Sequence, residues 1–66
     1  TVGDKLRQTL VTTKSISVQL EQYALDTQDK QAQQTYKVLA RQCSDIASVL
    51  QTRLLTLESE EPQYKS

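Results

Sequence analysis

The residues of this chain that repeat with helical spacing are arranged symmetrically about Gln28. Leu6 matches Leu50 and Thr13 matches Cys43, and the two residue numbers of each pair add to 56. Two helices that run antiparallel and meet near residue 28 would bring such pairs face to face. The same rule gives five further pairs, which are Leu10 with Ile46, Ser17 with Leu39, Leu20 with Tyr36, Ala24 with Ala32, and Val2 with Leu54.

These positions recur at intervals of three and four residues, which is the period of an α-helix and not of a strand. The pattern therefore predicts an all-α fold, an antiparallel two-helix hairpin with one continuous seam between the helices. We expect the core seam to contain Leu6, Leu10, Thr13, Leu20, Ala24, Ala32, Tyr36, Leu39, Cys43, Ile46, Leu50 and Leu54, with Ser17 as a further polar member.

The ends of the helices carry recognisable signals. Thr1 followed three residues later by Asp4 resembles a capping box. Thr27 and Asp29 are good N-cap residues for a second helix, and Pro62 ends it because the residue before a proline is disfavoured in the α region. We expect a helical hairpin over residues 1–61, with helices at about 3–25 and 30–60 joined by a turn at 26–29, and a short tail over 62–66.

A single core in 66 residues is small, and folds of this size usually need a disulfide, a metal or a partner. The only cysteine cannot form an intrachain disulfide, and there is no histidine to bind zinc. We therefore expect the hairpin to self-associate, most simply as a dimer that forms a four-helix bundle. A rival arrangement is a swapped dimer of two unbroken helices, which would form the same pairs between chains.

Further apolar residues lie outside the seam. Val11, Val18 and Leu25 recur at intervals of seven, and such a column on a helix suggests a surface for another chain. If that contact is head-to-tail and does not close, it produces an open polymer, a filament or fibre. The candidate interaction residues are Val11, Val18, Leu25, Leu57 and Tyr64.

Composition argues against several functions. Eight basic residues balance eight acidic ones, so the basic face of a nucleic-acid-binding protein is not expected. No apolar run approaches the roughly 20 residues that span a bilayer, and the N-terminus does not resemble a signal peptide. We expect a chain made in the cytoplasm that does not insert into a membrane and binds no cofactor or metal.

No pattern of residues indicates catalysis. The serine and threonine hydroxyls have no histidine to activate them, and Cys43 is expected to be a core residue. A ligand-binding or metal-binding bundle would have to use Thr13, Ser17 and Cys43, the only polar seam residues, which make a poor site. Glu58 belongs to an acidic cluster near the end of the second helix, which a basic partner such as Lys5 and Arg7 of another chain would suit.

The opening Thr1-Val2-Gly3, the middle segment 27–32 and the ending Glu60-Glu61-Pro62-Gln63-Tyr64-Lys65 resemble a family of short helical proteins of spore-forming Firmicutes, domain of unknown function 1657. Members often carry a proline near position 52, where this chain has Thr52. The resemblance implies a link with sporulation and spore resistance, and genes beside those of spore-membrane channel components. It supplies no catalytic residues.

Taken with the seam, the resemblance predicts a non-enzymatic structural or interaction protein that forms homo-oligomers and is associated with the spore. A role as an adaptor for a spore membrane protein is an alternative, and the open helical polymer is another.

Overall fold

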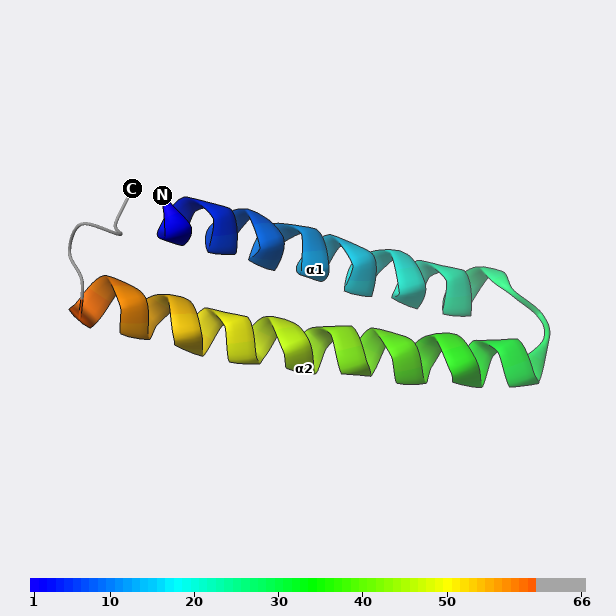
Figure 1. Ribbon diagram of the computed structural model, residues 1–66. Coiled ribbons are helices and arrows are strands. Elements are labelled where there is room, and N and C mark those ends of the chain that lie inside the picture. Colours follow the sequence, from blue (N-terminus) through cyan, green and yellow to red (C-terminus); the bar gives the residue numbers. More distant parts are fainter. Residues whose placement is uncertain (61–66) are drawn as a thin grey trace.

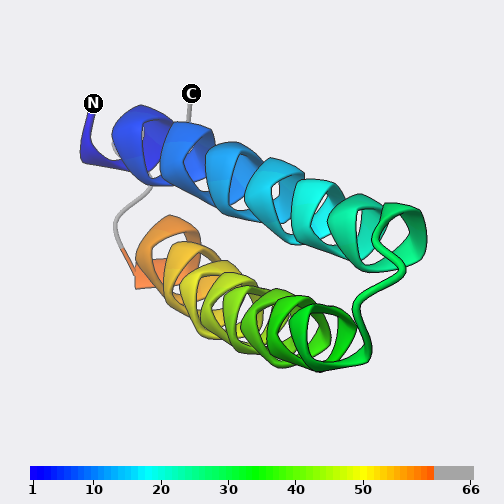
Figure 2. The ribbon, with the colours of Figure 1, turned by 90° about the vertical axis from the view of Figure 1, so that its right-hand side faces the viewer.

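The chain forms a helical hairpin in a computed structural model that describes residues 1–60. Helix α1 covers Val2–Asp26 and helix α2 covers Lys30–Glu60. The two helices lie side by side and antiparallel, so the start of α1 is beside the end of α2 (Figures 1 and 2). The Cα trace measures 48 × 14 × 11 Å. The all-α hairpin expected from the sequence is confirmed, while Pro62, Tyr64 and the tail 62–66 lie outside the described residues.

Helix α1 begins with the capping box that the sequence indicated. The Thr1 hydroxyl accepts a hydrogen bond from the backbone N–H of Asp4 at 3.1 Å, and the Asp4 carboxylate accepts one from the Thr1 nitrogen at 3.4 Å. Each interaction satisfies a donor that the first turn of a helix leaves without an intrahelical partner.

The chain reverses over residues 27–29, without glycine or a positive φ angle. Thr27 is extended (φ −84°, ψ 143°), and its N–H donates to the carbonyl of Tyr23 at 3.0 Å. Asp29 then begins α2, since its Oδ1 accepts from the N–H groups of Gln31 (2.9 Å) and Ala32 (3.2 Å). Of the two N-cap candidates, Asp29 is therefore the residue that caps α2. The Gln33 side chain donates to the Thr27 carbonyl at 2.8 Å and links the turn to α2.

We expect Asp29→Ala to lower the free energy of unfolding by about 0.5–2 kcal/mol, the usual cost of losing an N-cap. Asp26→Ala is the matched control, because the Asp26 carboxylate lies at the C-terminal end of a helix, where negative charge is mildly unfavourable. Urea denaturation at one protein concentration measures both. Equal losses in the two variants would contradict the assignment of Asp29 as the cap.

The buried residues repeat every seven positions on both helices. In α1 they are Gly3, Leu10, Ser17 and Ala24, and in α2 they are Ala40, Ala47 and Leu54. Half-buried residues fill the intervals of three and four between them, among them Leu6, Thr13, Leu20, Tyr36, Cys43 and Leu50. This is the spacing of the two core positions of a coiled coil, here folded back within one chain.

Most of the buried positions hold small residues, so the two helix backbones approach each other closely. The Ser17 hydroxyl is buried and donates across the interface to the backbone carbonyl of Ala40 at 3.0 Å. A side chain as short as serine reaches the other backbone only where no larger side chain separates the helices. The bulkier part of the core lies at the open end of the hairpin, where Leu10, Ala47 and Leu54 pack together with Leu6 and Leu50.

The expectation that Leu39 and Ile46 belong to the buried seam is wrong. They are 41% and 53% exposed, whereas the residues that follow them, Ala40 and Ala47, are buried. Likewise Val2 is exposed and Gly3 is buried. The cause is the close approach of the helices around Ser17 and Ala40, because only small side chains fit where the two backbones are this near. The larger neighbours, about 100° around the helix, stand beside this contact.

Candidate interaction surfaces

Large apolar residues that the core does not bury lie along one long side of the hairpin. Ile16 and Tyr23 precede the buried residues of α1, just as Leu39 and Ile46 precede those of α2. In an antiparallel helix pair the positions directly before these core residues flank the same edge of the contact. Tyr23 also meets Tyr36 of the other helix edge-to-face, with ring centroids 5.8 Å apart. We call Ile16, Tyr23, Leu39 and Ile46 the apolar flank, and each is more than 40% exposed.

The opposite long side is polar. Arg7 of α1 and Glu58 of α2 form an ion pair there, with Nη2 and Oε1 3.2 Å apart, and Arg7 also lies 3.5 Å from Asp4. The sequence suggested that Arg7 of a neighbouring chain would meet the acidic cluster, but Glu58 is paired with Arg7 of its own chain. The pair is partly exposed, so it contributes little to the stability of the fold.

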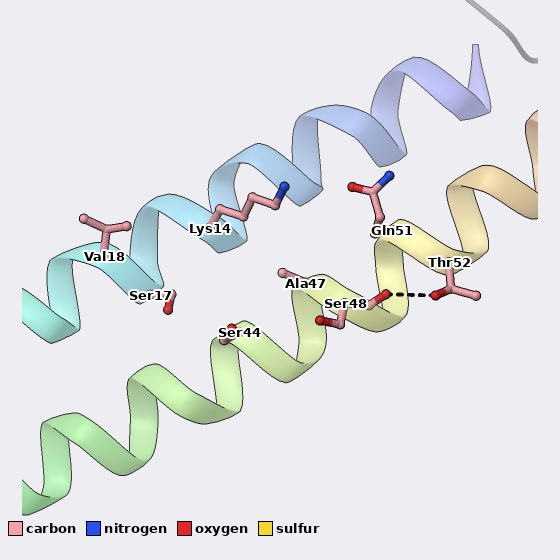
Figure 3. A pocket seen from close by; sticks show the side chains of 8 residues that line it. All are labelled: Lys14, Ser17, Val18, Ser44, Ala47, Ser48, Gln51 and Thr52. Atoms are coloured by element: carbon pink, nitrogen blue, oxygen red, sulfur yellow. Dashed lines mark hydrogen bonds between the residues drawn. The ribbon is translucent and has the colours of Figure 1, made fainter.

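A shallow groove of about 590 Å³ runs between the helices on this polar side. Figure 3 shows Lys14 and Gln51 extending over it from the two helices, with Ala47 at its floor. The hollow exists because α2 presents short side chains here. The lining residues are Lys14, Ser17, Val18, Ser44, Ala47, Ser48, Gln51 and Thr52.

The predicted interaction column lies at the rim of this groove. Val11, Val18 and Leu25 are 62%, 63% and 77% exposed, and each follows a buried residue of α1. Val18 lines the groove and points away from α2 (Figure 3). We call Val11, Val18 and Leu25 the α1 strip. Leu57, also predicted to take part in contacts, is half-buried.

The polar residues of the seam are used locally. The Thr13 hydroxyl donates to the Thr9 carbonyl at 2.8 Å, and Ser17 bonds to Ala40. Cys43 is a free, half-buried thiol. Within residues 1–60 no three His, Cys, Asp or Glu side chains lie close enough to hold a metal ion together. Neither of the two described helices is both long enough and apolar enough to cross a membrane.

The sequence interpretation did not identify three of the buried residues, Gly3, Ala40 and Ala47. A signal for them was present, because Ala40 and Ala47 lie fourteen and seven residues before Leu54, and Gly3 lies seven before Leu10. Selecting the largest apolar residue at each turn concealed this repeat and placed Leu39 and Ile46 inside the fold.

The comparisons with known proteins gave one match. The model of a family described as "Protein of unknown function (DUF1657)" matches residues 6–54, which include the seam of both helices and the turn. No curated protein matches the chain, and no solved structure matches it.

Proposed function

We propose that this chain, which belongs to the DUF1657 family of proteins of unknown function, is a non-enzymatic interaction protein that self-associates through its apolar flank. The observation that carries the proposal is the exposure of Ile16, Tyr23, Leu39 and Ile46 along one side of a hairpin whose own core is made mainly of small residues. Two copies packed flank to flank would form a four-helix bundle.

The size of the core supports self-association. Only Leu10 and Leu54 are large apolar residues buried in the hairpin, and no large side chain among residues 1–60 is completely buried. Each apolar side chain that moves from water to a protein interior contributes about 1.5–3 kcal/mol, so a hairpin with two such residues gains little. Packing the apolar flank against a partner buries additional large side chains. These side chains stay on the surface of a single hairpin because its helices approach each other closely.

The shape of the molecule favours a second copy as the partner on the side that carries the apolar flank. Stable interfaces bury about 800 Å² on each partner. The broad face of the Cα trace, which contains both helices, measures 48 × 14 Å, on the order of 700 Å² before side chains are added, so nearly the whole face must be covered. A second hairpin has the length to do so.

The proposed setting is the sporulating cell or the spore, and its only support is the family resemblance. The adaptor role for a spore membrane protein would use the same apolar flank. Fluorescence microscopy of a tagged chain during sporulation tests the setting, because a diffuse signal unrelated to the forming spore would contradict it.

The test of self-association is size-exclusion chromatography with light scattering. We expect a multiple of the 7.5 kDa chain mass for the parent protein and a smaller mass for the double variant Leu39→Glu/Ile46→Glu, because a carboxylate cannot be buried in an apolar interface without a partner. Circular dichroism should show that the helices remain, since both positions are exposed in the hairpin.

The matched control is Gln31→Glu/Gln34→Glu, which adds the same two charges to exposed positions in the first turns of α2. We expect it to keep the mass of the parent. A parent protein that is monomeric at about 100 µM, well above the micromolar range of weak complexes, would overturn the proposal.

A further inference from the structure

The geometry points to a second contact between copies: we propose that the α1 strip packs against the α1 strip of another molecule, antiparallel, with Val18 on the two-fold axis. The inference rests on the proposed self-association and adds to it, because this surface lies on the other long side from the apolar flank. The strip is the most exposed apolar feature of α1, and Leu25 at 77% is the most exposed large apolar residue in the described part of the chain.

The spacing of the strip fits a helix of the same kind. Val11, Val18 and Leu25 lie seven residues apart, so they form one column along α1. A heptad column is the pattern that packs against another heptad column. In an antiparallel pair centred on Val18, Val11 of one copy lies opposite Leu25 of the other, and every apolar residue of the strip has an apolar neighbour.

The distribution of charge on α1 favours the α1 helix of a second copy as the partner and favours an antiparallel direction. After Asp4, the charged residues of the first half are basic, Lys5, Arg7 and Lys14, whereas those of the second half and the turn are acidic, Glu21, Asp26 and Asp29. An antiparallel copy brings the basic half of one α1 beside the acidic half of the other. A parallel copy would place like charges together, which costs stability.

Lys14 and Glu21 are the charges nearest the centre. Both are exposed, and they lie three or four residues on either side of Val18. With Val18 on the axis, Lys14 of one copy lies opposite Gln22 of the other and directly beside its Glu21. Both Lys14 and Val18 line the groove, and Figure 3 shows Lys14 extending from α1. The two-fold axis repeats the Lys14–Glu21 pair, so each contact contains two of them.

The two contacts together have a consequence for assembly. Each is two-fold symmetric, and they use opposite long sides of the hairpin. A molecule with two such surfaces binds one copy on each side, and the assembly continues until its geometry closes or the supply of molecules ends. We therefore expect assemblies larger than the four-helix bundle when the α1 strip is intact.

Cysteine cross-linking tests the contact. In a Cys43→Ser background, Val18→Cys brings two thiols together on the axis, whereas two copies of Val11→Cys keep theirs about 21 Å apart, from 14 residues at 1.5 Å each. Disulfides need Cα separations of about 4.4–6.8 Å. We expect Val18→Cys to cross-link under mild oxidation at least about tenfold faster than Val11→Cys, and an equal mixture of Val11→Cys and Leu25→Cys proteins to form mixed disulfides.

Equal rates for Val18→Cys and Val11→Cys, or no cross-link at either position, would overturn the inference. Repeating Val18→Cys with Leu39→Glu/Ile46→Glu separates the two proposals. A cross-link that survives those substitutions supports the α1 contact independently of the flank. If the parent is a discrete dimer and Val18→Cys does not cross-link, the proposed flank contact stands and the proposed α1 contact is contradicted.

Exchange of the central charges tests the direction. Lys14→Glu or Glu21→Lys alone should slow the Val18→Cys cross-link about two- to tenfold, because each places like charges together twice in the contact. The double variant Lys14→Glu/Glu21→Lys should recover the parent rate, and about 1 M salt should remove the differences. Failure of the double variant to recover would contradict the antiparallel pairing.

Discussion

Leu54→Ala should be among the most destabilising single substitutions in this chain. Leu54 is 3% exposed and packs with Leu10 and Ala47, and Leu6 and Leu50 cover the same cluster. Truncation of a buried leucine costs about 2–5 kcal/mol, the sum of the lost transfer free energy and the cavity that remains. Domains have about 0.05–0.15 kcal/mol of stability per residue, so a chain of this length has only about 3–10 kcal/mol in total.

The expected result is therefore the loss of about half of the free energy of unfolding, from the middle of both ranges. At this size 1 kcal/mol corresponds to about 4–8 °C in the midpoint of thermal unfolding, so the midpoint should fall by about 8–40 °C. Urea or thermal denaturation followed by circular dichroism measures the change. Parent and variant need the same protein concentration, since self-association makes apparent stability depend on it.

Leu55→Ala is the matched control, since it makes the same substitution one residue further along α2. Leu55 is 60% exposed, and alanine has the higher helix propensity, so we expect a change of less than about 0.5 kcal/mol. A loss at Leu55 equal to that at Leu54 would mean that the two leucines do not differ in burial in solution. The rotation of α2 that buries Leu54 and exposes Leu55 would then be wrong.

Periodicity was sufficient to predict two antiparallel helices with a turn near residue 28, because steps of three and four residues depend only on the pitch of the helix. The capping box of α1 was also evident, since it depends on local spacing of side chains. The rotation of each helix about its own axis was not predictable in this way. It depends on how closely the backbones approach, and that distance is set by Ser17, Ala40 and Ala47 together and by no single residue.

The same limit applies to the interaction surfaces. Val11, Val18 and Leu25 were recognisable as a column outside the seam, because a spacing of seven is visible in the sequence. Leu39 and Ile46 of the apolar flank were not recognisable as surface residues, because they are the largest apolar residues of their turns, which is also what a core would select. An error of about 100° in the rotation of α2 exchanges its core residues with its surface residues. It therefore hid the exposure of Leu39 and Ile46, on which the proposed self-association depends.

The close approach of the helices gives the second large expected effect. Ala40→Leu inserts a large side chain where the Ser17 hydroxyl lies 3.0 Å from the Ala40 carbonyl. The helices must separate or the leucine must leave its preferred rotamer, at a cost of about 1–3 kcal/mol. Separation also breaks the hydrogen bond between the helices, which contributes about 0.5–1.5 kcal/mol. We expect a total loss of about 1.5–4.5 kcal/mol in urea denaturation.

Thr52→Leu is the control for added bulk, because Thr52 is exposed on α2 and leucine has the higher helix propensity. Its stability should equal or exceed that of the parent. Ala40→Gly separates the effect of packing from that of helix propensity, since it removes bulk. It should lower the free energy of unfolding by about 1 kcal/mol, the helix-propensity cost of glycine. An Ala40→Leu protein as stable as the parent would show that space exists between the helices at Ala40. Leu39 and Ile46 would then have room inside the seam, and close packing would not be what places them on the surface.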